Sequence, residues 1–166
     1  MFFDNFEAAN GWTVNPNATD AATGGVWERG NPEATALGGA KQLDATVSGV
    51  NCLVTGALAG GTAPVQSPAI ALPPTGNLTL SFAYYFSHAR KSTTADFLRV
   101  KVVGSTTTTV LQELGTSSND DAAWATASAS LNAFAGQTVR ILIEAADGAT
   151  DQVVEAAIDD VKIMQQ

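Results

Sequence analysis

The chain of 166 residues suits one domain spanning 1–166, because a single all-β sandwich often reaches this length. Hydrophobic residues make up 45% of it, which supports a packed interior, whereas charged residues are only 14%, against roughly 25% in ordinary soluble domains. The formal net charge of −8 opposes binding to nucleic-acid phosphates and to anionic membrane surfaces. We therefore expect no nucleic-acid partner. No apolar run approaches the length of a membrane span, so we expect no membrane insertion either.

The expected elements are short strands separated by turns. Before Asn77, clusters of Gly, Asn and Pro leave room for short strands at 2–7, 26–28, 52–55 and 70–72. The clearest strand is 77–86, where apolar residues alternate from Leu78 to Phe86. A hairpin of 97–103 with 110–114 follows, and then strands at 124–131, 138–145 and 153–163. Because no sustained helical period appears, this spacing predicts an all-β fold with two packed antiparallel sheets, a β-sandwich of the jelly-roll kind.

Acidic side chains gather in the first and last of these strands. They are Asp4 and Glu7 in the first strand, and Glu155, Asp159 and Asp160 in the last. Straight alternation along the last strand places Asp159 and Glu155 on the same face as Val161 and Ile163, where a carboxylate needs compensation. Terminal strands of a sandwich commonly lie close together, and oxygen ligands suit Ca²⁺. We therefore expect a structural calcium site, completed by a loop acid such as Asp20 or Asp44.

Two other interpretations of the acidic residues stay open. They could be edge charges that limit aggregation, or acceptors of backbone hydrogen bonds in turns. Paired carboxylates such as Asp120 and Asp121 could also serve a free-standing hydrolase, although such enzymes usually need a larger scaffold around a sugar cleft.

Exposed aromatic residues are candidates for a stacking platform that binds sugar rings or a peptide. By alternation Tyr85 faces away from the core, and Trp27 is the second candidate. The alternative is that each Trp covers the open end of the core. The single histidine, His88, is expected on a surface loop, and the single cysteine, Cys52, as a small buried apolar residue.

Five segments follow one another along the chain: Asp4-Asn5-Phe6-Glu7, Gly11-Trp12-Thr13-Val14, Trp27-Glu28-Arg29-Gly30-Asn31-Pro32, Val54-Thr55-Gly56 and Val154-Glu155-Ala156-Ala157-Ile158-Asp159-Asp160-Val161. In this order they resemble the MAM-like jelly-roll modules of secreted bacterial proteins and the related cleaved-adhesin domains. The resemblance implies a calcium ion held by acids of the first strand and of the Ile-Asp-Asp strand. It implicates Asp4 or Glu7 together with Asp159 or Asp160, and Asp20 stands where relatives often have an acidic loop.

The resemblance also implies a secreted, extracellular setting and an accessory role. We expect a non-catalytic module, stabilised by calcium, of a larger secreted bacterial hydrolase such as a peptidase. Its partners would be the parent catalytic domain and a protein or glycan ligand on a surface, with attachment as the role. The alternative is a carbohydrate-binding module that uses Tyr85 or Trp27.

Overall fold

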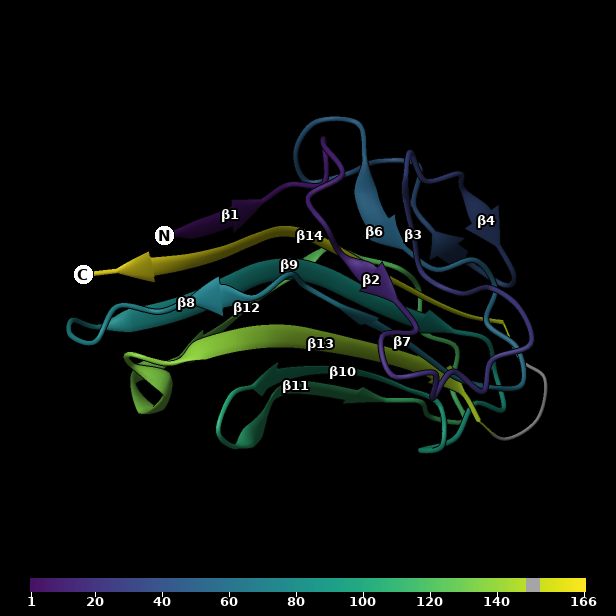
Figure 1. Cartoon of the computed structure of the whole chain (residues 1–166). Helices are drawn as coiled ribbons and strands as arrows, with labels where there is room; N and C mark the ends of the chain where they lie inside the picture. Colours follow the sequence, from purple (N-terminus) through teal and green to yellow (C-terminus); the bar gives the residue numbers. More distant parts are fainter. Residues whose placement is uncertain (149–152) are drawn as a thin grey trace.

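The structure is a computed structural model that describes residues 1–148 and 153–166. It contains two large antiparallel sheets and one small hairpin (Figure 1). The first sheet has the order β12 (Ala125–Ser130), β9 (Leu78–His88), β14 (Val154–Gln165), β6 (Cys52–Val54) and β3 (Glu28–Gly30), and β1 (Phe2–Asp4) pairs with β14. The second has the order β11 (Thr107–Leu114), β10 (Phe97–Val103), β13 (Thr138–Asp147), β7 (Gly61–Gln66) and β2 (Thr13–Val14), and β8 (Ile70–Ala71) pairs with β13. The expected two-sheet jelly-roll sandwich is confirmed.

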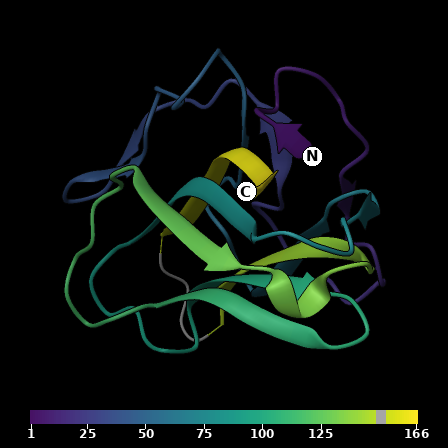
Figure 2. The same cartoon turned by 90° about the vertical axis from the view of Figure 1, so that its left-hand side faces the viewer.

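The two layers are clear from the end that carries both termini. In Figure 2, β9 (teal) and β14 (yellow) lie above the green strands of the second sheet. Phe2 pairs with Ile163 and Asp4 with Val161, so the first and last strands lie side by side, as expected. Among the described residues, no helix is long and apolar enough to cross a membrane.

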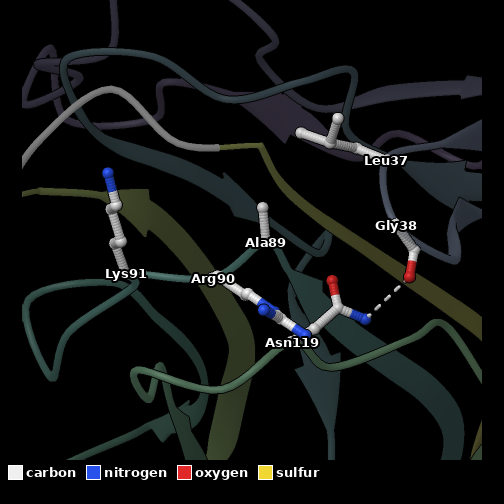
Figure 3. A pocket seen from close by; sticks show the side chains of 6 residues that line it. All are labelled: Leu37, Gly38, Ala89, Arg90, Lys91 and Asn119. Atoms are coloured by element: carbon white, nitrogen blue, oxygen red, sulfur yellow. Dashed lines mark hydrogen bonds between the residues drawn. The ribbon is translucent and has the colours of Figure 1, made fainter.

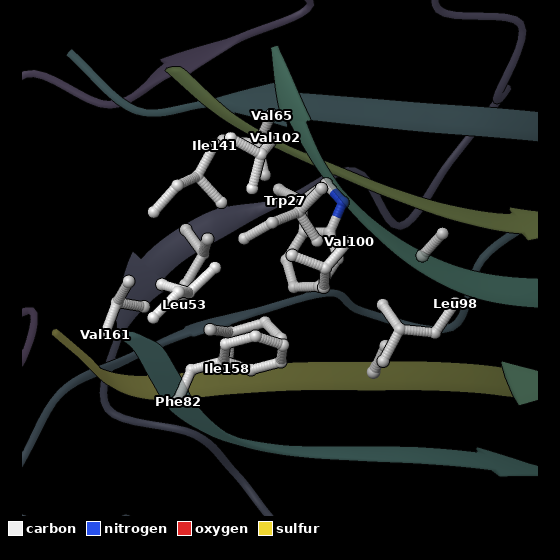
Figure 4. Close-up of a cluster of buried hydrophobic side chains, with 14 of the residues drawn as sticks. Trp27, Leu53, Val65, Phe82, Leu98, Val100, Val102, Ile141, Ile158 and Val161 are labelled. Atoms are coloured by element: carbon white, nitrogen blue, oxygen red, sulfur yellow. The ribbon is translucent and has the colours of Figure 1, made fainter. Parts of the chain in front are cut away.

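The space between the sheets is filled by the inward faces of the long strands (Figure 4). Leu80 and Phe82 of β9 pack there against Leu98 and Val100 of β10 and Ile158 of β14. The expected alternation along 77–86 and 97–103 is therefore confirmed on the inner side. Apolar burial of this kind, at about 25 cal/mol per Å² removed from water, is the main force holding the sheets together.

The outer face of the first sheet is also covered, which alternation in β9 does not predict. The chain between β3 and β6 forms a small hairpin, β4 (Thr35–Ala36) and β5 (Ala40–Gln42), that lies over this face. Under it, Cys52, Val54, Tyr85 and Ala157 form a second apolar cluster with Leu43, Ala122 and Trp124. The second half of β9 is consequently buried on both faces.

A β-bulge in β14 changes which residues face the core. The pairing of β14 with β9 shifts between Asp159 and Lys162, and Asp160 has a left-handed φ of 49°. Ile158 and Val161 are both in the core, whereas Asp159 pairs with Ala83 and Glu155 with Ser87 on the outer face. The expectation that Asp159 and Glu155 share a face with Val161 is therefore wrong, because one extra residue reverses the alternation.

Candidate functional site

Two of the acids expected to bind calcium, Asp4 and Asp20, accept hydrogen bonds within two separate segments of the chain. Asp4 is 1% exposed, and its carboxylate accepts hydrogen bonds from Phe6 N at 2.9 Å, Asn10 Nδ2 at 3.0 Å and Trp12 Nε1 at 2.8 Å. It therefore fixes the turn that follows β1. Asp20 lies apart, in a loop where it accepts from Ala22 N at 2.8 Å.

Glu7, Asp159 and Asp160 all bind one loop, residues 46–51. Glu7 Oε1 accepts from Val50 N at 2.9 Å and Asn51 N at 2.6 Å. Asp159 Oδ2 accepts from two further backbone N–H groups, of residues 47 and 48, at 2.9 and 3.2 Å. The hydroxyl of Ser48 donates to Asp160 Oδ1 at 2.6 Å. The structure thus brings Glu7, from the turn after β1, and the Asp159–Asp160 pair of β14 to the same loop.

The electrostatics of these acids differ with their burial. Burial raises the pKa of Asp159 above its ordinary value, the nearby charge of Asp160 adds to the rise, and the backbone N–H groups offset part of it. Glu7 is exposed, and the N–H groups of Asn51 and Val50 lower its pKa. Within residues 1–148 and 153–166, no three Asp, Glu, His or Cys side chains converge as a metal cluster. The carboxylates of Glu7, Asp159 and Asp160 would offer only oxygen atoms as metal ligands, which is what a hard cation prefers. One of these atoms, Asp160 Oδ2, accepts no hydrogen bond in the described chain.

Neither aromatic candidate is exposed. Tyr85 does face away from the inter-sheet core, but it is 2% exposed because Trp124 packs on it edge to face, with ring centroids 4.9 Å apart. Trp27 is also 2% exposed and donates from Nε1 to Ala63 O at 2.9 Å within the core. The expected exposure of Tyr85 is therefore wrong, because the chain between β3 and β6 covers this face. Trp27 follows the alternative interpretation, in which tryptophan covers the core.

The two other singled-out residues are both buried. Cys52 is 0% exposed, as expected. Its burial is the main reason that the pKa of its thiol is raised to about 12, and the charge of Asp159 adds to the rise. His88 is 1% exposed, so the surface-loop expectation is wrong. It ends β9 instead of following it, its Nε2 accepts from Thr116 N at 3.3 Å, and its Nδ1 lies 3.1 Å from Ala89 O.

A cavity of about 360 Å³ opens where β9 ends (Figure 3). We call it the Arg90–Lys91 cavity; its lining residues are Leu37, Gly38, Ala89, Arg90, Lys91 and Asn119. Leu37 and Gly38 belong to the turn of the β4–β5 hairpin, and Asn119 belongs to the segment between β11 and β12. Arg90, Lys91 and Leu37 are exposed, whereas Ala89 is buried. The volume lies in the range of small-molecule sites.

The walls of this cavity are held by buried polar contacts. Lys41 of β5 is fully buried and donates from Nζ to Asp121 Oδ1 at 2.6 Å and to Asp120 O at 3.0 Å. Asp120 pairs through its main chain with His88 at the end of β9. At the other side of the hairpin, the Thr35 hydroxyl donates to the buried Glu155 at 2.7 Å. The hairpin turn and the 119–121 segment are thus fixed to the sheet on either side of the cavity.

Asn119 joins the two walls directly. Its Nδ2 donates to Asp121 Oδ1 at 2.6 Å and to Gly38 O at 3.4 Å, the second contact drawn in Figure 3. With Nδ2 held in this way, Oδ1 is left as an acceptor. Donors from Arg90 and Lys91 and an acceptor from Asn119 therefore surround one space, a combination that suits a polar, negatively charged ligand.

Sequence reasoning did not find this site. A signal existed, since Arg90-Lys91 is the only pair of adjacent basic residues in a chain with 8 basic and 16 acidic residues. The contribution of Leu37 and Asn119 could not be found, because each lies far from Arg90 in sequence. A second cavity of about 210 Å³ includes Tyr84, Glu113, Asp120 and Asp121. Tyr84 donates its hydroxyl to Glu113 at 2.8 Å there, and the acidic lining disfavours an anion.

Fold and site together define a jelly-roll β-sandwich with a loop-built cavity at one end of its long strands. The MAM domain family (meprin/A5/mu) matches residues 5–166. The chain belongs to that family.

Solved structures with this fold include two cleaved adhesin domains. The K3 domain of Lys-gingipain from Porphyromonas gingivalis w83 is 17% identical with a TM-score of 0.60, covering 100% of this chain and 99% of that one. The K2 domain of Lys-gingipain is 14% identical with a TM-score of 0.59, covering 99% and 98%.

A third neighbour is the C-terminal family 22 carbohydrate-binding module of Clostridium thermocellum Xyn10B. It is 14% identical with a TM-score of 0.50, covering 99% of this chain and 91% of that module. At these identities the likeness is one of fold. No curated protein matches the chain.

Proposed function

We propose that the chain is a non-catalytic accessory module that attaches a larger secreted bacterial hydrolase, such as a peptidase, to a glycan or protein ligand on a surface. The Arg90–Lys91 cavity is the attachment site. The observation that carries the proposal is a cavity of about 360 Å³ lined by two basic side chains that have no acidic partner in the part of the chain that the structure describes. The occurrence of this fold in domains named as adhesin and carbohydrate-binding modules supports a binding role.

Rigid support of the cavity favours binding over a chance hollow between loops. A site that is fixed before the ligand arrives spends less free energy on ordering when it binds. Here the wall from β5 is anchored by a fully buried lysine, and the facing wall by main-chain pairing to His88. Arg90 and Lys91 remain exposed at the opening.

Removing the two charges tests the proposal. The double variant Arg90→Gln/Lys91→Gly is compared with the wild type on an array of bacterial, plant and animal glycans and on immobilised extracellular proteins. Lys91 has a left-handed φ of 75°, so glycine fits its backbone and the fold is preserved. Lys162→Gln is the matched control, because Lys162 is an exposed basic residue outside the cavity.

We expect the wild type and the control to bind at least one array component and the double variant to lose that binding. Equal binding by all three proteins, or no binding by any, would overturn the cavity as the attachment site.

We also propose that the module is stabilised by calcium held by Asp159 and Asp160 with Glu7 or Asp4. Oxygen-only donors and the buried carboxylate of Asp159, whose pKa burial raises, support this. The ion would supply positive charge beside carboxylates that lack a basic partner. Asp20 is the weaker candidate for this calcium site, because it belongs to a different loop. That loop is fixed by Asn15, whose Oδ1 accepts a hydrogen bond from Asp20 N at 2.9 Å.

Thermal unfolding with EDTA and then with excess Ca²⁺ tests the calcium proposal. A ligand present at about 100 times its Kd stabilises the folded state by about 2.7 kcal/mol, which raises the melting temperature. Asp160→Asn should remove the calcium-dependent rise, whereas Asp20→Asn should leave it unchanged. Overlapping unfolding curves with and without Ca²⁺ would refute the site.

A further inference from the structure

Most basic side chains of the chain are already engaged. Lys41 pairs with Asp121 and Lys101 with Glu144, each at 2.6 Å. The remaining engaged side chains are Arg29, which donates to Phe6 O, Arg140, which donates to Ser67 O, and Arg99, which donates to Gln112 and lies over the Phe97 ring. Among the basic residues, which all lie in the described part of the chain, only Arg90, Lys91 and Lys162 have side chains without a hydrogen bond or ion pair.

Two of these three lie next to each other on one cavity, in a protein whose net charge is −8. Such a local reversal of charge attracts an anion that the rest of the surface repels. Among residues 1–148 and 153–166, no acidic side chain lines the Arg90–Lys91 cavity, and Asp121, an acid of the adjoining 119–121 segment, is already bound to Lys41 and Asn119. A ligand that enters therefore meets uncompensated positive charge.

The backbone holds Lys91 at this position at some cost. Its φ of 75° lies in the left-handed region, which is unfavourable for a residue with a side chain. The N–H of Lys91 donates to Ser117 O at 3.3 Å, and the N–H of Ala89 donates to Val153 O at 2.9 Å, so both sides of the turn are fixed. Strained residues of this kind concentrate at binding sites, where the surrounding structure keeps them in place.

The cavity also offers acceptors beside its cations. Asn119 Oδ1 lies 3.5 Å from the point where a Cβ of Gly38 would stand, so it faces the hairpin wall. Gly38 O accepts only the long 3.4 Å bond from Asn119 Nδ2 and can take a second donor. Figure 3 shows the Arg90 side chain extending toward Asn119, with Leu37 and Gly38 across from it.

We propose that the Arg90–Lys91 cavity binds an acidic saccharide, with the carboxylate of a uronic acid residue on Arg90 and with Lys91 adding positive charge from another side of the cavity. Its ring hydroxyls donate to Asn119 Oδ1 and Gly38 O, and its apolar ring face lies against Leu37. An acidic peptide side chain also carries a carboxylate, but it has no hydroxyls for the adjacent acceptors. This inference rests on the proposed attachment function and adds the chemical class of the ligand.

Isothermal titration calorimetry with matched ligands tests the class. The probes are trigalacturonate, its fully methyl-esterified form, which keeps the shape but removes the charge, and triglutamate. Trimers of glucuronate and mannuronate widen the search among uronates. The proteins are the wild type, Arg90→Gln, Lys91→Gly and the control Lys162→Gln, each checked for an unchanged melting temperature.

We expect at least one uronate trimer to bind about tenfold or more tightly than a neutral ester, because charge-assisted hydrogen bonds to the carboxylate are lost in the ester. Either cavity variant should weaken binding, the control should not, and raising NaCl from about 50 mM to about 500 mM should weaken binding further.

Four other results would overturn the inference in distinguishable ways. Equal binding of acid and ester, lost in the cavity variants, removes the charge requirement and leaves the attachment site intact. If no uronate binds but a neutral glycan binds through the cavity, the acidic ligand class is excluded and the attachment site is likewise retained. Triglutamate binding as tight as that of the uronates assigns the site to acidic peptides. Uronate binding that the cavity variants do not alter contradicts both the inference and the proposed function.

Discussion

The ion pair between Lys41 and Asp121 makes a sharp prediction because its two ends have different surroundings. The two charged atoms are 2.6 Å apart, but the lysine side chain is 0% exposed and the aspartate side chain is 51% exposed. Asp121→Asn removes the carboxylate that is paired with Lys41 and leaves the ammonium with Asp120 O at 3.0 Å and the nearby charge of Glu155. A buried ammonium that loses its ion-pair partner destabilises the fold by about 3 kcal/mol.

Lys41→Met breaks the same ion pair from the buried end and should cost much less. The methionine fills the space of the lysine stem, and the exposed Asp121 keeps water and the Asn119 amide at 2.6 Å. Asp120 O keeps its bond from His88 N at 3.1 Å. We expect Lys41→Met to lower the free energy of unfolding by no more than about 1 kcal/mol, since an apolar replacement of a buried charge is often nearly neutral.

Urea unfolding, which gives the free energy of unfolding, and thermal unfolding, which gives the melting temperature, are both followed by tryptophan fluorescence for the two variants. For a chain of this length about 1 kcal/mol corresponds to roughly 2–4 °C, so Asp121→Asn should lower the melting temperature by about 6–12 °C and Lys41→Met by far less. Equal losses, or a larger loss for Lys41→Met, would refute the argument that burial of Lys41 decides the cost.

Three further predictions concern buried groups. Cys52 should resist alkylation in the folded protein, because it is 0% exposed and its pKa is raised to about 12, and should react fully in urea; labelling before unfolding would contradict its burial. Burial raises the pKa of Glu155, which the Thr35 hydroxyl and the charge of Lys41 offset in part. A carboxyl with a raised folded-state pKa contributes stability that is present below its ordinary pKa of 4.5 and is lost as pH rises through the folded value. Glu155→Gln should therefore gain stability relative to the wild type as the pH rises above 4.5, and a difference independent of pH would exclude this burial effect. Trp27→Phe should cost about 1 kcal/mol or more in urea unfolding, since it removes the bond to Ala63 O and part of the core volume; an unchanged unfolding midpoint would show that this bond contributes nothing.

The sandwich itself could be predicted because its signals are local. Alternation along β9 and β10 follows from side chains that point to opposite faces of a strand, and the glycine and proline clusters mark the turns. The pairing of β1 with β14 could be expected from the usual proximity of chain ends.

The misplaced residues depend on contacts that no local pattern records. Tyr85 is buried because the segment before β6 folds back over β9, which alternation within β9 cannot reveal. Straight counting along β14 predicts the wrong face for Glu155 and Asp159, because the bulge at Asp160 inserts one residue that such counting does not include.

The Arg90–Lys91 cavity could not be assembled from sequence for the same reason. Its lining comes from the hairpin turn at Leu37, the end of β9 and the segment at Asn119. The expected acidic grouping could be foreseen in part, since Glu7, Asp159 and Asp160 do meet at one loop. The open alternative, in which these acids accept backbone hydrogen bonds in turns, is confirmed for Glu7 and Asp159, whereas the loop that donates those bonds could not be identified from sequence.

Mapping a bound ligand by ¹H–¹⁵N NMR tests the central claim most directly. The chain is titrated with the tightest binder from the array, and the side-chain amide of Asn119 and the backbone amide of Gly38 are followed beside the indole N–H signals of Trp27 and Trp124. The account predicts saturable shifts at Asn119 and Gly38, with the indoles unchanged because they bond to Ala63 O and Ala45 O and neither tryptophan is among the lining residues of the cavity. Shifts centred on the Trp124 indole, with Asn119 and Gly38 unmoved, would contradict the assignment of the binding site.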